Sequence, residues 1–204
     1  MAEPAVAWSP PANVLAAIDA LRIRDVQGSL KSDGRPVQLS PPVGVVALGR
    51  ALKAKFPTTL GPAQIRAGSS HHGAGPRRDV HEEGRAIDLM IPNLATGEQI
   101  ANFLSLNAQA LGLQGVIFRR RNWYSNYPVG RRFVDYRGRS PHTDHVHMEV
   151  SPDYAYRSAA EVDAVMAQID AGGGSAPSSH FWLYAFGAVL IGGAAALILT
   201  KDSR

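Results

Sequence analysis

Two short segments alternate apolar residues with residues that carry chemistry, and this alternation constrains the fold more than any other feature. Residues 86–91 read AIDLMI and residues 145–150 read HVHMEV. Alternate side chains of a β-strand lie on the same face. The chemically active residues of the second segment would therefore share one face: His145, His147 and Glu149. If the two segments form neighbouring strands, Asp88 and His147 can converge.

A histidine in the loop before the first segment could complete this group. His81 lies shortly before Asp88, and Gly84 between them would let the loop turn tightly. Two imidazoles and one carboxylate, with a fourth position left for water, form the ligand set of a catalytic zinc ion. Because the chain has no cysteine, any metal must be held by His, Asp or Glu.

Such an ion lowers the pKa of its bound water and polarises a carbonyl, and a neighbouring base could accept and return the proton. His145 is one candidate base because it shares a face with His147. Asp144 is the other, although an unbroken strand would direct it away from the ion. It can contribute only if the strand starts after it or bulges there.

The spacing of these residues resembles a known family. The pattern HEEGRAID that starts at His81, followed by HVH from His145 to His147, resembles the zinc peptidases named after lysostaphin, D-Ala-D-Ala peptidases and the hedgehog domain. His142, three residues before His145, adds a resemblance to the penicillin-insensitive murein endopeptidase branch. In that branch the histidines that match His142 and His145 both belong to the active site. Asp144 instead matches the acidic general base of the branch that cleaves D-Ala-D-Ala and, in phages, L-alanyl-D-glutamate bonds.

The resemblance covers roughly residues 41–150. It implies zinc on His81, Asp88 and His147, and a peptide bond of bacterial peptidoglycan as substrate. It leaves the scissile bond open among D-Ala-D-Ala, D-Ala-diaminopimelate, L-Ala-D-Glu and glycyl bonds. Family members also use an Arg or Ser to hold a substrate carboxylate. The candidates for that role are Arg66, Ser69 and Ser70, with Arg77, Arg78 and Arg85 as rivals.

The rest of the pattern predicts an α+β fold, in which a small antiparallel sheet that carries the zinc site is flanked by helices. Helical spacing of apolar residues is present in four segments: 13–23, 43–56, 97–113 and 158–169. Strands are expected in four others: 64–67, 86–91, 115–118 and 145–150.

The C-terminal part predicts a membrane anchor. Residues 181–200 carry no charged side chain, a length that spans a hydrocarbon core, and aromatic residues gather at its first end. The N-terminus shows no export signal pattern, so the export route stays open. The expected organisation is an N-terminal segment with one helix that packs on the domain, a peptidase domain, a Gly/Ser linker, a transmembrane helix and a basic tail: residues 1–40, 41–170, 171–180, 181–200 and 201–204.

These features predict a single-pass membrane protein, a zinc peptidase that cuts peptidoglycan. It would face the cell wall of a bacterium, or act in phage entry or lysis from a virion membrane. The alternative is a non-catalytic module, in which the zinc fold survives as a surface that binds cell-wall fragments or another polyanion.

A cluster of arginines interleaved with aromatic residues offers a further surface. The formal net charge is only +4 and the pI about 9.6, so the preference for polyanions is mild. We expect a loop that grips the anionic glycan–peptide polymer. The same composition describes a nucleic-acid surface, but no nucleic-acid motif accompanies it, so no specific nucleic acid is expected. The arginines are Arg119, Arg120, Arg121, Arg131, Arg132, Arg137 and Arg139.

Overall fold

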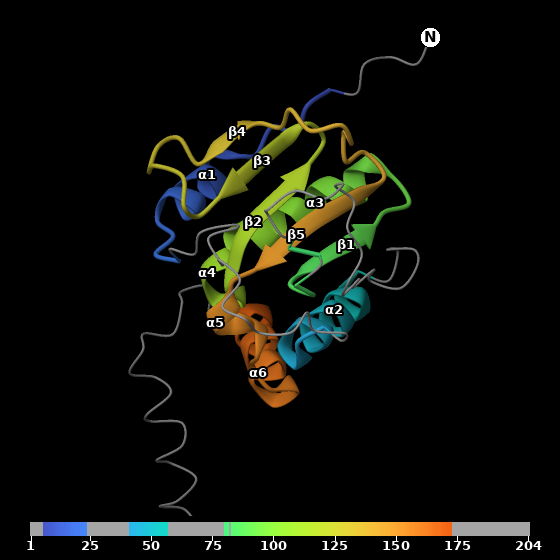
Figure 1. Cartoon of the computed structure of the whole chain (residues 1–204), viewed down its shortest axis with the longest axis vertical. Helices are drawn as coiled ribbons and strands as arrows, with labels where there is room; N and C mark the ends of the chain where they lie inside the picture. Colours follow the sequence, from blue (N-terminus) through green and yellow to red (C-terminus); the bar gives the residue numbers. More distant parts are fainter. Residues whose placement is uncertain (1–5, 24–40, 57–79, 82, 173–204) are drawn as a thin grey trace, which may run out of the picture. The chain divides into compact units, whose positions relative to one another are not determined.

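The computed structural model describes residues 6–23, 41–56, 80–81 and 83–172 (Figure 1). Within these residues the predicted α+β fold with a small antiparallel sheet is confirmed. The sheet has the strand order β1-β5-β2-β3-β4. Its strands are β1 (Ala86–Met90), β2 (Leu113–Phe118), β3 (Arg121–Tyr124), β4 (Phe133–Asp135) and β5 (His145–Val150). The two segments with alternating chemistry are therefore neighbours, as convergence of their polar side chains requires.

Helices flank this sheet, and most of them follow the sequence pattern. They are α1 (Ala12–Asp19), α2 (Val43–Lys55), α3 (Leu94–Leu106), α4 (Ala108–Leu111), α5 (Pro152–Ala155) and α6 (Ala159–Asp170). Ser158, where the sequence predicts the start of the last helix, caps the N-terminus of α6. Its side chain accepts a hydrogen bond from the Glu161 N–H, and the Glu161 carboxylate accepts one from the Ser158 N–H.

The single helix predicted for residues 97–113 is wrong in its bounds. Helix α3 starts earlier, at Leu94, because the Asn93 side chain accepts a hydrogen bond from the Thr96 N–H at 2.9 Å and caps the first turn. It ends at Leu106, and α4 follows as a separate turn. Gly112 terminates α4 with a φ of +69°, a left-handed conformation that glycine adopts without steric cost.

Helix α3 covers one face of the sheet, where Figure 1 shows it behind β2 and β5. The strand residues on that face are apolar and fully buried: Val116, Phe118, Trp123, Val146 and Met148. The Trp123 indole N–H donates to Ser105 Oγ of α3 at 2.9 Å, which fixes the sheet against the helix. The core thus uses one face of β5, and the histidines project from the opposite face.

Strands β3 and β4 were not predicted, since charged and aromatic residues obscure their alternation. The turn between β2 and β3 places Arg119 and Arg120 at φ values of +42° and +62°. Their backbone N–H groups donate to the carbonyls of His142 and Pro141, each at 3.0 Å. This turn therefore anchors the loop that carries His142.

Two predictions lie outside the described residues, namely the strand at 64–67 and the membrane span at 181–200. In the part of the chain that the structure does describe, no helix is long and apolar enough to cross a membrane.

Candidate metal centre

The pairing of β1 with β5 brings the candidate ligands together. In the antiparallel register Asp88 lies directly opposite His147, and Met90 lies opposite His145. Directly opposed residues of an antiparallel pair project to the same face. Asp88 and His147 therefore leave the sheet side by side, on the face opposite α3.

A tight turn delivers His81 to the same place. The Gly84 N–H donates to the His81 carbonyl, and the Arg85 N–H donates to the Val80 carbonyl, both at 3.0 Å. Gly84 has a φ of +70°, and a β-carbon there would lie 2.9 Å from Pro41 Cα. The position requires glycine for both reasons, as expected from the sequence.

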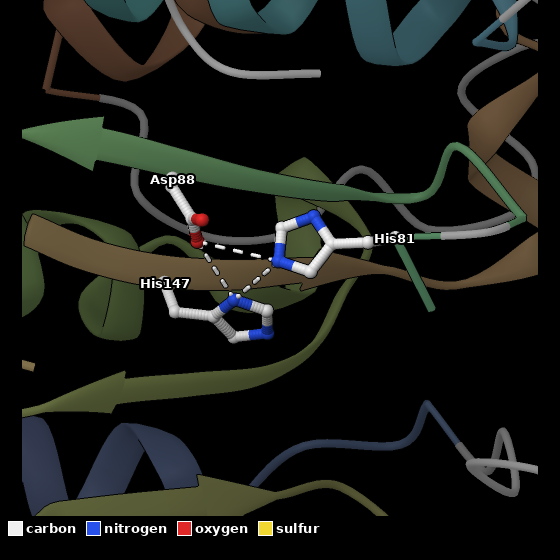
Figure 2. Close-up of side chains that lie close together, drawn as sticks. All are labelled: His81, Asp88 and His147. Atoms are coloured by element: carbon white, nitrogen blue, oxygen red, sulfur yellow. Dashed lines mark hydrogen bonds and ion pairs between the residues drawn. The ribbon is translucent and has the colours of Figure 1, made fainter. Parts of the chain in front are cut away.

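The three side chains converge on one point (Figure 2). His147 Nδ1 lies 2.9 Å from Asp88 Oδ1 and 3.2 Å from His81 Nε2, and His81 Nε2 lies 3.4 Å from Asp88 Oδ1. Around a tetrahedral ion with bonds of about 2.0–2.1 Å, ligand atoms lie about 3.3 Å apart. The group could therefore hold a metal ion. Two nitrogen donors and one carboxylate oxygen suit several divalent transition metals, zinc among them.

The electrostatics of the group also suit a cation. Burial alone would raise the pKa of Asp88, but hydrogen bonds and charge from His147 and His81 outweigh it and hold that pKa well below its usual range. Burial alone would lower the pKa of His147, but the carboxylates of Asp88 and Glu149 outweigh it and raise that pKa. Without a metal, a proton on His147 balances these carboxylates, and a metal ion would have to displace it.

Both candidate bases lie beside the group and touch each other. Strand β5 starts at His145, so Asp144 stands just before the strand and its carboxylate is free to turn back. Asp144 Oδ1 lies 2.7 Å from His145 Nδ1, and His145 Nε2 lies 3.7 Å from Asp88 Oδ1. Because a carboxylate only accepts hydrogen bonds, the neutral His145 imidazole has its proton on Nδ1 and its lone pair on Nε2, the nitrogen that faces the metal group.

His142 joins the same cluster. Its ring centroid lies 4.7 Å from that of His145 and 4.8 Å from that of Tyr136. Its Nδ1–H donates to the Ser140 carbonyl at 3.0 Å, so its lone pair is on Nε2. Burial, together with the nearby charges of His147 and His145, lowers the pKa of His142 to about 4. His142 is therefore a neutral imidazole at neutral pH.

A second layer of polar residues lies behind His147. Glu149, on the same face of β5, is buried with its carboxylate 3.3 Å from His147 Nε2. Gln114 donates to that carboxylate, and Arg85 donates to the Gln114 carbonyl oxygen. The sequence placed Glu149 on the correct face but gave no reason to select Gln114. Its only signal there was a polar residue in the otherwise apolar run LQGVIF.

This layer corrects one expectation from the sequence. Arg85 was a rival for holding a substrate carboxylate, but it is 4% exposed and donates to Glu83 and Gln114. Glu83 forms an ion pair with Arg85, with an N–O distance of 2.5 Å. The other candidates for this role lie outside the described residues: Arg66, Ser69, Ser70, Arg77 and Arg78.

The arginine cluster divides into internal and exposed members. Arg119 pairs with Glu98, and Arg121 lies 3.2 Å from Asp135 and over the Phe133 ring. Arg132 is buried against the end of α1. The exposed members are Arg120, Arg131, Arg137 and Arg139. Within the described part of the cluster, these four are the arginines most open to a polyanion, and Arg137 lines an open hollow of about 550 Å³ beside β4, together with Arg121.

Comparison with known proteins gives a family for this arrangement. A family model described as the VldE C-terminal domain matches residues 42–147, just over half of the chain. The chain belongs to the VldE C-terminal domain family. The part that matches the VldE domain runs from the start of α2 to His147, so it contains all three members of the metal group. No curated protein and no solved structure matches the chain.

Proposed function

We propose that this chain is a zinc-dependent peptidase that hydrolyses peptide bonds of bacterial peptidoglycan. One observation carries the proposal. A three-residue group with metal-sized spacing lies next to an imidazole, His145, whose lone pair faces the group and whose other nitrogen is held by Asp144. Three protein ligands with a base beside them are the composition of a hydrolytic zinc site.

A bound zinc ion would lower the pKa of a water molecule and polarise the scissile carbonyl. His145 Nε2 would accept the proton of the attacking water and return it to the leaving amine. Asp144 would keep the His145 ring in the tautomer that leaves Nε2 free to accept. His142, neutral and fixed by Ser140, would restrict the rotation of the His145 ring that it packs against.

The substrate class rests on the resemblance of the motifs to the lysostaphin, D-Ala-D-Ala peptidase and hedgehog group. Arg66, Ser69 and Ser70 are proposed to hold a substrate carboxylate. We further propose that residues 181–200 anchor the enzyme in a membrane, so that the catalytic domain stays close to the wall polymer.

The test measures metal and activity in the same samples of the full chain. Plasma mass spectrometry should find about one zinc per wild-type chain, with none in His147→Ala. The His145→Ala variant should retain zinc and lose most of its rate of muropeptide release from purified sacculi, measured by mass spectrometry. Thr143→Ala, in the same loop but without an assigned role, is the matched control and should keep both.

The outcomes separate the enzyme from the alternative. A wild type that carries zinc and binds sacculi but releases no peptide would favour the non-catalytic binding module. Full zinc in the His147→Ala variant would show that the ligand assignment is wrong.

A further inference from the structure

We propose that a buried row of three side chains, Arg85, Gln114 and Glu149, fixes which nitrogen of His147 faces the metal. We name this row the relay. Its last member, Glu149, is 2% exposed and lies 3.3 Å from His147 Nε2. A carboxylate only accepts hydrogen bonds, so Nε2 keeps its proton, and a bound metal ion would take the lone pair of Nδ1 after displacing the proton there. Nδ1 is the nitrogen that faces Asp88 and His81.

The direction of the relay is set at Arg85, because a guanidinium can only donate. Arg85 Nη1 donates to Gln114 Oε1 at 3.0 Å. This contact decides the orientation of the Gln114 amide, since the reverse orientation would place its NH₂ group against another donor. The amide nitrogen then points to Glu149 and donates to Oε2 at 2.9 Å.

Arg85 is itself held in place. Its Nε and Nη2 donate to Glu83 Oε2 at 2.9 and 2.5 Å, and its Nη1 also donates to the Val150 carbonyl. The charges of Arg85 and Glu83 offset each other, so the relay transmits an orientation to His147 without adding net charge beyond Glu149. Outer hydrogen-bond partners of this kind orient metal-binding imidazoles and increase their basicity.

A local irregularity of the sheet builds the relay. Leu113 pairs with Val150 and Gly115 pairs with Glu149, so Gln114 is one additional residue in β2. A bulge redirects a side chain that regular alternation would place elsewhere. Here it directs Gln114 toward the Glu149 carboxylate.

This inference rests on the proposed metal centre but not on peptidase activity, so zinc affinity of the full chain is the readout. Glu149→Gln should weaken zinc binding about 10–100-fold, the range known for outer partners of metal ligands. Its new amide must oppose either the Gln114 NH₂ group or the His147 N–H with a second donor. Gln114→Glu should weaken binding similarly, because it places a second carboxylate against Glu149.

The double variant Glu149→Gln/Gln114→Glu exchanges the two groups and restores the donor–acceptor pairs within the relay and to His147. Arg85 can donate to Glu at position 114, Gln at 149 can donate to that Glu, and His147 can donate to the oxygen of that Gln. The double variant should therefore bind zinc more tightly than either single variant. Competition with a chromophoric chelator measures all four affinities.

Two further measurements separate orientation from general loss of structure. Ser105→Ala removes a buried hydrogen bond to Trp123 on the opposite face of the sheet, so it should lower the urea midpoint and leave zinc affinity unchanged. Nitrogen-15 NMR of the zinc-loaded wild type should show the His147 proton on Nε2.

Several results would overturn the inference. They are single variants within about threefold of the wild type, a double variant no better than the weaker single variant, or a His147 proton on Nδ1. A wild type that binds no zinc would instead remove the metal centre itself, and the relay with it.

Discussion

Replacement of Arg132 by methionine is expected to destabilise the fold by about 2–4 kcal/mol, although this arginine belongs to a cluster that reads as a polyanion-binding surface. Arg132 is 6% exposed, and its Nη1 donates to the carbonyls of Ile18 at 2.6 Å and Leu21 at 2.8 Å. Ile18 lies in the last turn of α1 and Leu21 lies two residues beyond its end, so the guanidinium sits at the negative end of the helix dipole. Arg132 thus fastens the N-terminal helix to the loop after β3.

The magnitude follows from these contacts. A hydrogen bond to a charged group contributes about 1.5–3 kcal/mol, so two contribute about 3–6 kcal/mol. Part of this loss is offset, because methionine fills a similar volume and removes the cost of burying a charge. With a urea m-value of about 2 kcal/mol/M, the remaining loss should lower the unfolding midpoint by about 1–2 M.

Arg131 is the matched control, because it is the exposed neighbour of Arg132 in the same loop. Arg131→Met should leave the urea midpoint nearly unchanged and weaken low-salt binding to sacculi. Arg132→Met should lower the urea midpoint and leave low-salt binding to sacculi nearly unchanged. If the two variants unfold within about 0.5 kcal/mol of each other, the assignment of Arg132 to the helix end is refuted.

Four further predictions concern the site and the helices. Zinc affinity should rise about tenfold per pH unit between about pH 6 and 8, because the raised pKa of His147 keeps it protonated without metal. Calorimetry in buffers of different ionisation enthalpy should find about one proton released per zinc ion bound, and the release of no proton would contradict the prediction. In the zinc-free chain, the pKa of His142 is about 4, below its unfolded value of 6.5, so the unfolded state binds the additional proton and the free energy of unfolding should fall as the pH drops from about 6.5 to 4. Urea curves should show a smaller fall for His142→Phe, and an equal fall would show that His142 is not the responsible group. Chelation of zinc should lower Tm, and zinc at 100-fold above Kd should add about 2.7 kcal/mol, whereas an unchanged Tm would argue against a native-state metal site. Ser158→Ala should cost about 1 kcal/mol in urea unfolding through loss of the α6 cap, and an unaltered midpoint would disprove that role.

The elements that the sequence predicts well are those governed by local rules. The alternation in residues 145–150 gives β5 with its exact bounds and assigns His145, His147 and Glu149 to one face, since side-chain direction in a strand has a period of two. Gly84 marks the turn that delivers His81, because a left-handed backbone there needs glycine. Local pattern failed where a cap or a bulge intervened, as at Asn93 and Gln114.

By itself, then, the sequence determined which residues carry chemistry and which face of its strand each one occupies. Tertiary structure alone decided that β1 pairs with β5 so that Asp88 opposes His147, that Asp144 turns back to His145, and that Gln114 stands behind Glu149. The physical reason is that side-chain direction depends on the nearest residues in the chain. The partner of a strand or of a buried charge depends on which distant segments pack together. Arg132 is an example, because it belongs to an arginine-rich segment but donates to the end of α1 and is buried there.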